Sequence, residues 1–497
     1  MPAISQLLSQ DEGKTLEFKR DLSSPRPLLK TLVAFANTAG GRLIVGVGDD
    51  KTIHGVAAPL DDEERLCNLI ADHINPRLVP NIELVTVENK TLLVIEVFLS
   101  GQRPHWLKAE GPEQGVYVRL GSTNRQADSA LINELRRSVE GHTFDEQPMP
   151  DLTTKDLDLE LAQQLFSQRK LDDNTLRTLR LLTPYQGRMV PTRGAILLFG
   201  KQRLLHYPDA WVQCGRFLGT EKLDIFDHIE INGPLPLAVD EIILFLKKHA
   251  YRGADLSEIR RKDVWSIPLT ILREVIINAL AHSDYAQRGA PIRVVFLDDR
   301  IEVENPGILL PGLTIDDLKQ GTSRIRNNVI ARVFRELNLI EQWGTGVRRI
   351  FSEAATMALP EPKIEEIGMR LRFTIYLKQP IPAIAEHAST QLRSKPTSAE
   401  SRPETRLESR LESRLESNLA TKLFLLLAQA PAGKAELATR LGHHSVSGGL
   451  HKQIKSLLQQ GLIEMTLPEK PNSRLQKYRL TEHGKALLEQ NQSGNTP

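Results

Sequence analysis

The chain has 497 residues, of which 40% are hydrophobic and 25% are charged. This length is too great for a single hydrophobic core, so we expect a globular protein of roughly three or four domains. The formal net charge of +2 excludes a basic field over the whole molecule, so any nucleic-acid contact must come from a local patch.

The cysteine pattern and the absence of long apolar runs bear on the compartment. Cys67 and Cys214 lie far apart and lack metal-ligand spacing, which argues against a disulfide framework and against a cysteine zinc site. The N-terminal string MPAISQLLSQDEGK is too polar for a signal peptide, and no run of about 18 apolar residues occurs. We therefore expect a cytoplasmic protein with no membrane partner.

The N-terminal segment, residues 1–145, mixes predicted strands with a predicted helix. Residues 15–19 alternate polar and apolar side chains, as in a strand, whereas residues 28–38 have helical periodicity and stop at Gly40 and Gly41. Residues 42–48 then form a buried strand before a turn at Asp49 and Asp50. Further strands are expected at residues 92–98 and 115–120.

Three strings in this segment carry a family resemblance. They are Glu12 followed after four residues by EFK, the run LLKTLVAFANTAGGRLIVGVGDD from Leu28, and the run YVRLGSTNRQA from Tyr117. Together they resemble the Schlafen AlbA-like domain, an α/β domain associated with DNA binding. The resemblance covers nearly all of the segment.

In some Schlafen relatives this domain is an RNA nuclease that uses two glutamates and an aspartate. The resemblance places those groups on Glu12, on Glu17, and on Asp49 or Asp50. Acidic groups gathered at one sheet edge could hold Mg²⁺ or Mn²⁺ for phosphodiester cleavage. Lys19, on the same strand face as Glu17, could then stabilise the phosphate charge.

Two other interpretations of these residues stay open. Glu17 and Lys19 could be exposed strand positions, with the two aspartates serving only the turn, and Gly48 departs from the usual acidic start of that turn. Alternatively, the segment contacts the nucleic-acid backbone without cleaving it. The cations available for such contact are Lys19, Arg20, Arg42, Arg119 and Arg125.

The middle segment, residues 146–385, follows an acidic, proline-containing stretch at residues 142–157 that we interpret as a linker. Its expected elements are helices at residues 159–168, 173–182, 236–249 and 329–336 and strands at residues 210–218, 292–297 and 300–304.

The most informative stretch is a predicted helix at residues 273–285. Glu274, Asn278 and His282 fall at i, i+4 and i+8, so they share one ridge of a mostly apolar helix. An amide oxygen can ligate Mg²⁺, and a carboxylate can orient or deprotonate water. The alternative is a half-buried helix whose polar ridge faces solvent, with His282 and Asp284 serving local hydrogen bonds.

Downstream motifs favour a nucleotide site. The helix is followed by a strand that ends in Asn305-Pro306-Gly307, by an Arg-bearing connector with Arg324, and by Gly344-Thr345-Gly346 before another helix. A glycine-rich turn that opens a helix can cradle phosphate through free backbone N–H groups.

The order and wording of these motifs resemble the GHKL ATPase fold, an α/β sandwich, and more specifically the domain known as RecG-like C-terminal. The resemblance implies that Glu274 handles the attacking water, Asn278 holds Mg²⁺, and Gly344 and Gly346 meet the phosphates of ATP. Asn305 stands where GHKL proteins carry the adenine-reading aspartate, but the second glycine after it is missing. The chain contains no G-x4-GK[ST] motif, so we do not expect a helicase.

The remainder comprises a linker at residues 386–419 and a compact segment at residues 420–497. The linker includes a repeated Arg-Leu-Glu-Ser string, which is either a self-association helix or a spacer. The compact segment has the element order of a winged helix-turn-helix, a fold that binds DNA or, in some proteins, another protein. The DNA-contacting candidates are Ser447, His451, Lys452 and Lys455 on the recognition helix and Lys470, Arg474 and Lys477 on the wing.

The sequence therefore predicts an α+β multidomain protein: an AlbA-like domain, a GHKL-like domain and a winged helix. Its predicted function is that of a cytoplasmic, homo-oligomeric, DNA-binding transcription regulator with an ATP-binding sensor module. The alternative is a metal-dependent Schlafen-like nuclease acting on tRNA or another nucleic acid, in phage defence. Whether the chain is an enzyme, either an ATPase or a nuclease, stays open.

Overall fold

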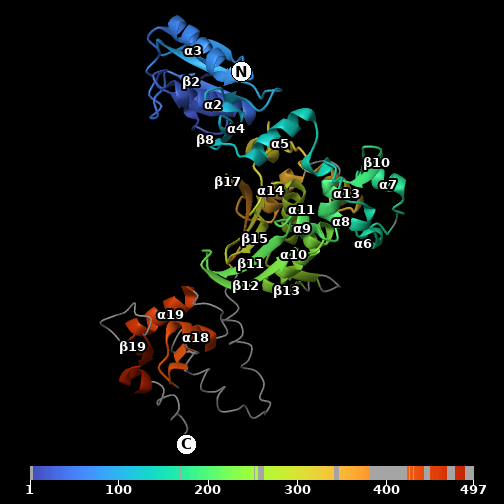
Figure 1. Cartoon of the computed structure of the whole chain (residues 1–497). Coiled ribbons are helices and arrows are strands. Elements are labelled where there is room, and N and C mark those ends of the chain that lie inside the picture. Colours follow the sequence, from blue (N-terminus) through green and yellow to red (C-terminus); the bar gives the residue numbers. More distant parts are fainter. Residues whose placement is uncertain are drawn as a thin grey trace, which may run out of the picture. The chain divides into compact units, whose positions relative to one another are not determined.

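The structure is a computed structural model, and its chain divides into two compact units, residues 1–388 and 389–497. Figure 1 shows mixed helices and strands in both units. The described residues are 4–167, 169–250, 252–255, 262–340, 346–380, 423–424, 426–428, 430–440, 448–466 and 476–486.

The N-terminal region is built on a four-stranded sheet with the order β1-β2-β5-β4. β1 (Leu16–Lys19) runs parallel to β2 (Gly41–Val45), and the other pairings, with β5 (Lys90–Val97) and β4 (Asn81–Val87), are antiparallel. α2 (Pro25–Asn37) has proline in its first turn and buries an apolar run against the sheet. The predicted first strand and helix are therefore confirmed.

Smaller elements complete this region. They are α1 (Ile4–Ser9), α3 (Pro59–His73), β3 (Ile74–Asn75), β6 (Trp106–Leu107), α4 (Gly111–Gln114), β7 (Tyr117–Leu120), β8 (Thr123–Gln126) and α5 (Ser129–Glu140). Asp128 caps α5 by accepting a hydrogen bond from the Leu131 N–H at 2.8 Å. Figure 1 shows α5 where the N-terminal elements meet the central ones.

The central region contains a six-stranded sheet with the order β12-β11-β15-β16-β18-β17. Its strands are β11 (Val212–Leu218), β12 (Asp224–Ile231), β15 (Ile292–Phe296), β16 (Arg300–Pro306), β17 (Lys363–Ile367) and β18 (Arg370–Tyr376). Only β11 and β15 pair in parallel; the pairings of β11 with β12, β15 with β16, β16 with β18 and β17 with β18 are antiparallel. The predicted hairpin at residues 292–304 is thus confirmed.

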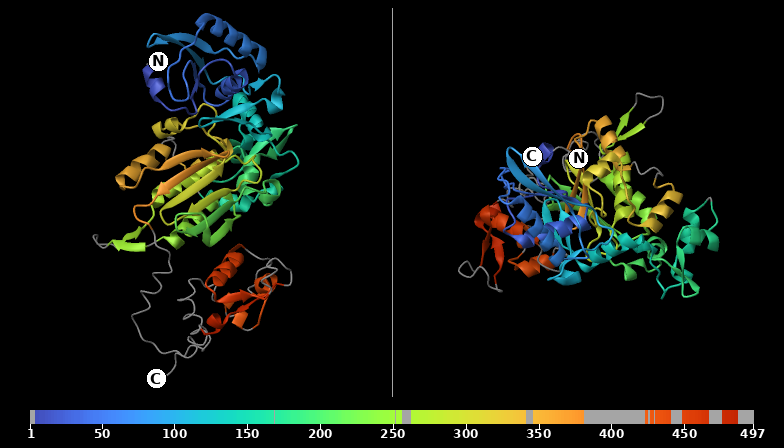
Figure 2. Two further views of the ribbon diagram at one scale, coloured as in Figure 1. Left: turned by 90° about the vertical axis from the view of Figure 1, so that its left-hand side faces the viewer. Right: turned by 90° about the horizontal axis from the view of Figure 1, so that it is seen from above.

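Helices pack against this sheet through one large apolar core. α11 (Leu269–His282) contributes Leu272, Val275 and Leu280, which cluster with buried side chains of β15 and β16. Other helices of the region are α8 (Arg193–Phe199), α10 (Leu235–His249), α12 (Ile315–Gln320), α13 (Asn328–Glu336) and α14 (Gly346–Thr356). The left view in Figure 2 shows the sheet with helices beside it.

Short elements surround that core. They are α6 (Leu159–Leu165), α7 (Asp173–Thr178), β9 (Leu182–Tyr185), β10 (Arg188–Pro191), α9 (Arg203–His206), β13 (Arg252–Asp255) and β14 (Lys262–Trp265). α7 ends earlier than predicted, because the chain reverses at Arg180, which has a φ of 56°.

The stretch interpreted as a linker, residues 142–157, is packed into the fold. It contains two short 3₁₀ helices, η1 (Phe144–Glu146) and η2 (Thr154–Asp156). Asp145 is fully buried, and its carboxylate accepts the backbone N–H groups of Val329 and Ile330 at 2.7 and 2.9 Å. These donors belong to the first turn of α13, where N–H groups lack partners within the helix.

The second unit has a small core of its own. It contains α18 (Lys434–Arg440), α19 (Gly448–Gln459), and β19 (Ile463–Met465) paired antiparallel with β20 (Tyr478–Leu480). Phe424, Leu437 and Leu457 are buried together with Tyr478. These elements occur in the predicted order, and the assignment as a winged helix stays a prediction. The linker at residues 386–419 lies outside the described residues.

Two properties of the described residues concern membrane-spanning helices and the state of the cysteines. No helix among them is both long and apolar enough to cross a membrane. Cys67 and Cys214 are both free thiols, and burial raises the pKa of Cys214 to about 12.

We expect Asp145 to make stability depend on pH. Burial raises its pKa from 3.8 to about 6 in the folded chain, so its contribution is fully present below the unfolded pKa and is lost as pH rises through about 6. The free energy of unfolding of the wild type should therefore fall by on the order of 1 kcal/mol between about pH 5 and about pH 7.5. In Asp145→Asn, which has no carboxyl group to titrate, this decrease should be absent. Urea titrations of both proteins at the two pH values measure this difference.

The matched control is Asp151→Asn, because Asp151 is exposed. Its free energy of unfolding should follow that of the wild type at both pH values. An Asp145→Asn variant with the unaltered wild-type pH dependence would contradict the assignment.

Candidate functional site

The polar ridge of α11 borders a cavity in the central region. Asn278 Nδ2 donates to Glu274 Oε1 at 3.0 Å and to the Glu274 carbonyl oxygen at 2.8 Å. The Arg349 guanidinium from α14 donates to Glu274 Oε2 at 3.0 Å. Asn278 and His282 line the cavity itself. Two of the three ridge residues therefore face this cavity, and all three are partly buried.

Several predicted residues from separate segments meet at this cavity. Its lining consists of Asn278, His282, Asn305, Gly307, Ile308, Leu309, Leu310, Leu313, Leu318, Ser323, Arg324, Arg326, Val347, Leu371 and Phe373. Most of the wall is apolar, with a few polar groups, as in small-molecule sites generally. The structure thus brings together the helix, the strand end and the connector that the sequence singled out.

The end of β16 forms a tight corner of the cavity. Asn305 is buried and its amide donates to the Pro306 carbonyl at 3.1 Å, which fixes the side chain. Gly307 has a φ of 101°, and a Cβ there would come within 3.0 Å of the Arg326 guanidinium carbon and of Asp284 Cβ. Glycine suits this position because it adopts a positive φ without strain and has no Cβ to crowd these neighbours. Ile308 and Leu309, which follow this glycine, form part of the apolar wall.

The start of α14 lies against the other end of the ridge. A Cβ on Gly346 would lie 1.9 Å from Glu274 Oε1 and 3.5 Å from Asn278 Nδ2, so the backbone passes directly over these polar groups. The Glu274 carboxylate fills the space beside this backbone, so a phosphate could approach Gly346 only after that carboxylate moves away. Gly344 and Thr345 lie outside the described residues.

The cavity holds about 60 Å³, enough for a few water molecules but not for a nucleotide. Arg324, whose guanidinium donates to the Pro311 carbonyl at 2.8 Å, is part of its wall. Admission of a nucleotide therefore requires movement of wall side chains or of the connector that carries Arg324.

His282 is neutral at this cavity. Burial, reinforced by the positive charge of Arg326, lowers its pKa to about 4. A neutral imidazole offers one donor and one acceptor, which suits hydrogen bonding to a base or a sugar better than proton transfer near pH 7.

Residues of the N-terminal region contact the outer side of the cavity wall. Arg326 is buried, forms an ion pair with Glu134 of α5, and donates to the Ile308 carbonyl. The Ile308 side chain packs in a cluster with Val118, Leu131 and Leu135. No local pattern in the sequence indicates the Arg326–Glu134 pair, because its partners are 192 residues apart.

Two further bonds join the same parts. Lys14 Nζ lies 2.8 Å from Glu366 Oε2, and Glu366 Oε1 accepts the Leu309 N–H at 2.8 Å. The Gly312 N–H donates to the Thr38 carbonyl, at the end of α2, at 2.7 Å. Movement of the Ile308–Leu313 wall would therefore break or strain these bonds to the N-terminal region.

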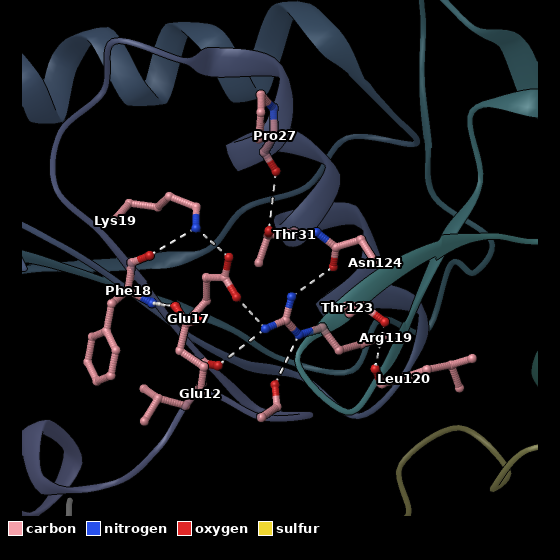
Figure 3. A network of polar contacts seen from close by, with 12 residues as sticks. Glu12, Glu17, Phe18, Lys19, Pro27, Thr31, Arg119, Leu120, Thr123 and Asn124 are labelled. Carbon is pink, nitrogen blue, oxygen red and sulfur yellow. Dashed lines mark hydrogen bonds and ion pairs between the residues drawn. The ribbon is translucent and has the colours of Figure 1, made fainter. Parts of the chain in front are cut away.

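A second group of predicted residues forms a buried network in the N-terminal region (Figure 3). Arg119 is completely buried and pairs with Glu17, which also contacts Lys19 Nζ at 2.5 Å. The Arg119 guanidinium further donates to the Gly13 carbonyl and to Asn124 Oδ1, each at 3.0 Å. This network ties β1 to β7 and β8.

Arg119 was predicted to contact nucleic acid, and the structure contradicts that role because its side chain has no exposed surface. Arg119 is the one charged residue of β7, and the local sequence does not show that other segments cover its side chain. Arg42 pairs with Glu96 at 2.5 Å, whereas Arg20 and Arg125 are exposed and available for contact.

The predicted metal ligands are not gathered. Glu12 Oε1 accepts the Phe18 N–H at 2.8 Å, and Glu17 is occupied by two cations. Asp49 is exposed, and Asp50 caps the turn by accepting the Thr52 N–H at 3.0 Å. Across the described ranges, no group of three or more His, Cys, Asp or Glu residues could hold a metal ion.

The candidates in the second unit are described only in part. Lys455 on α19 and Lys477 beside β20 are exposed, as DNA contact requires. His451 and Lys452 belong to α19. Ser447, Lys470 and Arg474 lie outside the described residues.

Three regions match known families. Residues 12–128 match the family described as "Schlafen, AlbA_2", and residues 289–375 match "Putative ATP-dependent DNA helicase recG C-terminal". Residues 420–481 match the C-terminal domain of "Filamentation induced by cAMP protein Fic-like". The second match includes Asn305, Gly307 and Arg324 but begins after α11. No curated protein matches the chain.

Two solved structures are similar in part. The DIP2311 protein of Corynebacterium diphtheriae is 20% identical over 98% of this chain and 97% of its own, with a TM-score of 0.41. The N-terminal domain of a RecG-related protein from Nitrosomonas europaea is 29% identical over 26% of this chain and 94% of its own, with a TM-score of 0.21. Three separate parts of the chain are thus similar to known families, one to Schlafen AlbA_2, one to the recG C-terminal family and one to the Fic-like C-terminal domain.

Proposed function

We propose that the protein is a nucleic-acid-binding regulator, with DNA its main target, whose central region binds ATP and signals its occupancy to the N-terminal region. The observation that carries the proposal is the single cavity at which Asn278, Asn305, Gly307 and Arg324 meet. The match of residues 289–375 to a family named for an ATP-dependent enzyme supports ATP as the ligand.

The residues at this cavity fit Mg²⁺ and ATP. Because Asn278 Nδ2 is bound to Glu274, the amide is oriented, and its oxygen accepts no hydrogen bond from any described residue. An amide oxygen of this kind would hold Mg²⁺, which would neutralise phosphate charge when bound. Arg324 and the backbone near Gly346 would meet the phosphates, while Asn305 and His282 would hydrogen-bond the nucleoside.

The environment of Glu274 favours sensing over rapid hydrolysis. Each of its carboxylate oxygens already accepts a hydrogen bond, one from Asn278 and the other from Arg349, so the carboxylate is not free to orient an attacking water. The bond from Arg349 also joins α14 to α11. We therefore assign Glu274 to closing the site and to orienting Asn278.

A nucleic-acid target is supported by the recG match, whose description names a DNA helicase, and by the match to Schlafen AlbA_2, which the sequence resemblance associates with DNA binding. The chain lacks a P-loop, so the proposal does not include helicase activity. The nuclease alternative has no support from geometry, because Glu12, Glu17 and Asp49 are not gathered. Self-association and a cytoplasmic location stay predictions.

Mg-ATP should raise the midpoint of thermal unfolding of the full-length protein. A ligand at about 100 times its dissociation constant stabilises by ~2.7 kcal/mol, which corresponds to a shift of a few degrees. The shift should disappear in Asn278→Ala and should shrink when EDTA removes Mg²⁺. Asn68→Ala, on the exposed face of α3, is the matched control and should respond like the wild type. No wild-type shift at millimolar ATP would refute ATP binding.

Glu17→Gln should lower stability through the loss of the Arg119 ion pair. Removing one partner of a buried pair leaves an uncompensated charge and costs about 3–5 kcal/mol. Urea unfolding measures this cost, and Glu64→Gln, an exposed position on α3, should have no comparable effect. Neither variant should change the fate of tRNA or duplex DNA incubated with Mn²⁺.

The nuclease alternative predicts the opposite result in that incubation. Wild-type cleavage that requires Mn²⁺ and is lost in a folded Glu12→Gln variant would overturn the regulator proposal. Glu12 is suited to this test because its side chain is exposed.

A further inference from the structure

A groove separate from the nucleotide cavity lies between α5 and the central region. Its lining is Ser129, Ala130, Asn133, Arg136, Arg137, Glu140, Phe144, Gln147, Arg193, Tyr207, Tyr285, Ala286 and Arg288. Its volume is about 570 Å³, against about 60 Å³ for the nucleotide cavity. The groove is therefore large enough to admit a ligand without rearrangement.

The groove is strongly positive for a protein of net charge +2. Four arginines line it, and Glu140 is the one acidic residue in the lining. Within the described part of the chain, none of these arginines forms an ion pair with a carboxylate: Arg136, Arg137, Arg193 and Arg288. Four arginines beside a single carboxylate in one groove favour an anionic ligand.

Phe144 positions two of these cations. The guanidinium carbons of Arg193 and Arg137 lie 4.5 and 5.5 Å from the centre of its ring, within the range of cation–π attraction. The Arg193 Nε is buried and has no hydrogen-bond partner. An unpaired buried donor costs free energy, and an oxygen of a bound anion could recover it.

The aromatic residues of the groove serve as walls and not as stacking surfaces. Tyr207 and Tyr285 are 7% and 9% exposed, so neither offers a free face to a base. Burial raises the pKa of Tyr207 to about 12 even though Arg193 and Arg288 lower it, so the ring stays neutral beside two cations. A neutral, apolar wall strengthens the attraction between the groove arginines and an anion, and it makes no contact that distinguishes one base from another.

We propose that this groove binds the phosphodiester backbone of nucleic acid through Arg136, Arg137, Arg193 and Arg288. This inference rests on the proposed function, and it identifies the surface at which nucleic acid would bind. An open groove with cations on three chain segments suits consecutive phosphates of a polymer, and its lack of an exposed aromatic face predicts binding without base preference.

The position of the groove also connects it to the nucleotide site. Arg137 borders both this groove and an adjoining hollow that is lined by Arg324 and Arg326. Those two arginines also line the nucleotide cavity. α5 therefore forms one wall of the groove, and its Glu134 is the ion-pair partner of Arg326.

The test is fluorescence anisotropy of labelled duplex DNA of arbitrary sequence with the full-length protein, over salt from about 50 to about 200 mM. The test variant is Arg136→Glu/Arg288→Glu, because both side chains are exposed and, among the described residues, neither forms an ion pair with a carboxylate. The matched control is Arg65→Glu/Arg177→Glu, which changes the net charge equally at exposed helical positions outside the groove.

We expect the test variant to bind about tenfold or more weakly and to lose about two units of slope in the plot of log affinity against log salt. The control should stay within about twofold of the wild type. Thermal unfolding should show both variants folded, and Mg-ATP should shift both as it shifts the wild type.

Three outcomes would overturn the proposal. Equal binding by both variants would place the DNA elsewhere and leave the proposed function standing. A wild-type protein without salt-sensitive binding would refute the groove and the nucleic-acid part of the proposed function together. A test variant that loses only the Mg-ATP shift would make the groove a site for free nucleotide phosphates.

Discussion

The buried charge of Arg326 is the constraint on which the arrangement of the first unit depends. A guanidinium taken out of water must find a counter-charge and acceptors, and breaking such a pair costs about 3–5 kcal/mol. Here the counter-charge is Glu134 on α5, and one acceptor is the Ile308 carbonyl in the wall of the nucleotide cavity. The same guanidinium leaves no room for a side chain at Gly307. One cation thus fixes a helix of one region and a cavity wall of another.

The sequence predicted the parts of the candidate site whose cause is local. The ridge of Glu274, Asn278 and His282 follows from helical spacing, and the β15–β16 hairpin follows from apolar alternation about a short turn. Because these elements pack on one core, the strand end at Asn305 necessarily approaches the helix. Local patterns therefore sufficed to indicate which motifs belong together.

Burial of polar groups between distant segments was not predictable. A strand pattern tells which residues share a face but not which face another segment covers, so Arg119 was expected at the surface and is wholly buried. In the same way, residues 142–157 have the composition of a linker, yet Asp145 is held inside by the free N–H groups of α13. The arginine groove depends on the second of these corrections, because Phe144 and Gln147 of the supposed linker line it together with residues of α5 and α8.

The small volume of the nucleotide cavity has a consequence for affinity. If ATP enters only a conformer whose wall has moved, the apparent dissociation constant equals the intrinsic one divided by the fraction of open molecules. With about one molecule in a hundred open, binding weakens about a hundredfold, and every contact that keeps the wall closed, including Lys14 with Glu366, contributes to that loss. The bonds between the two regions would then set the ATP concentration to which the protein responds, without touching the nucleotide.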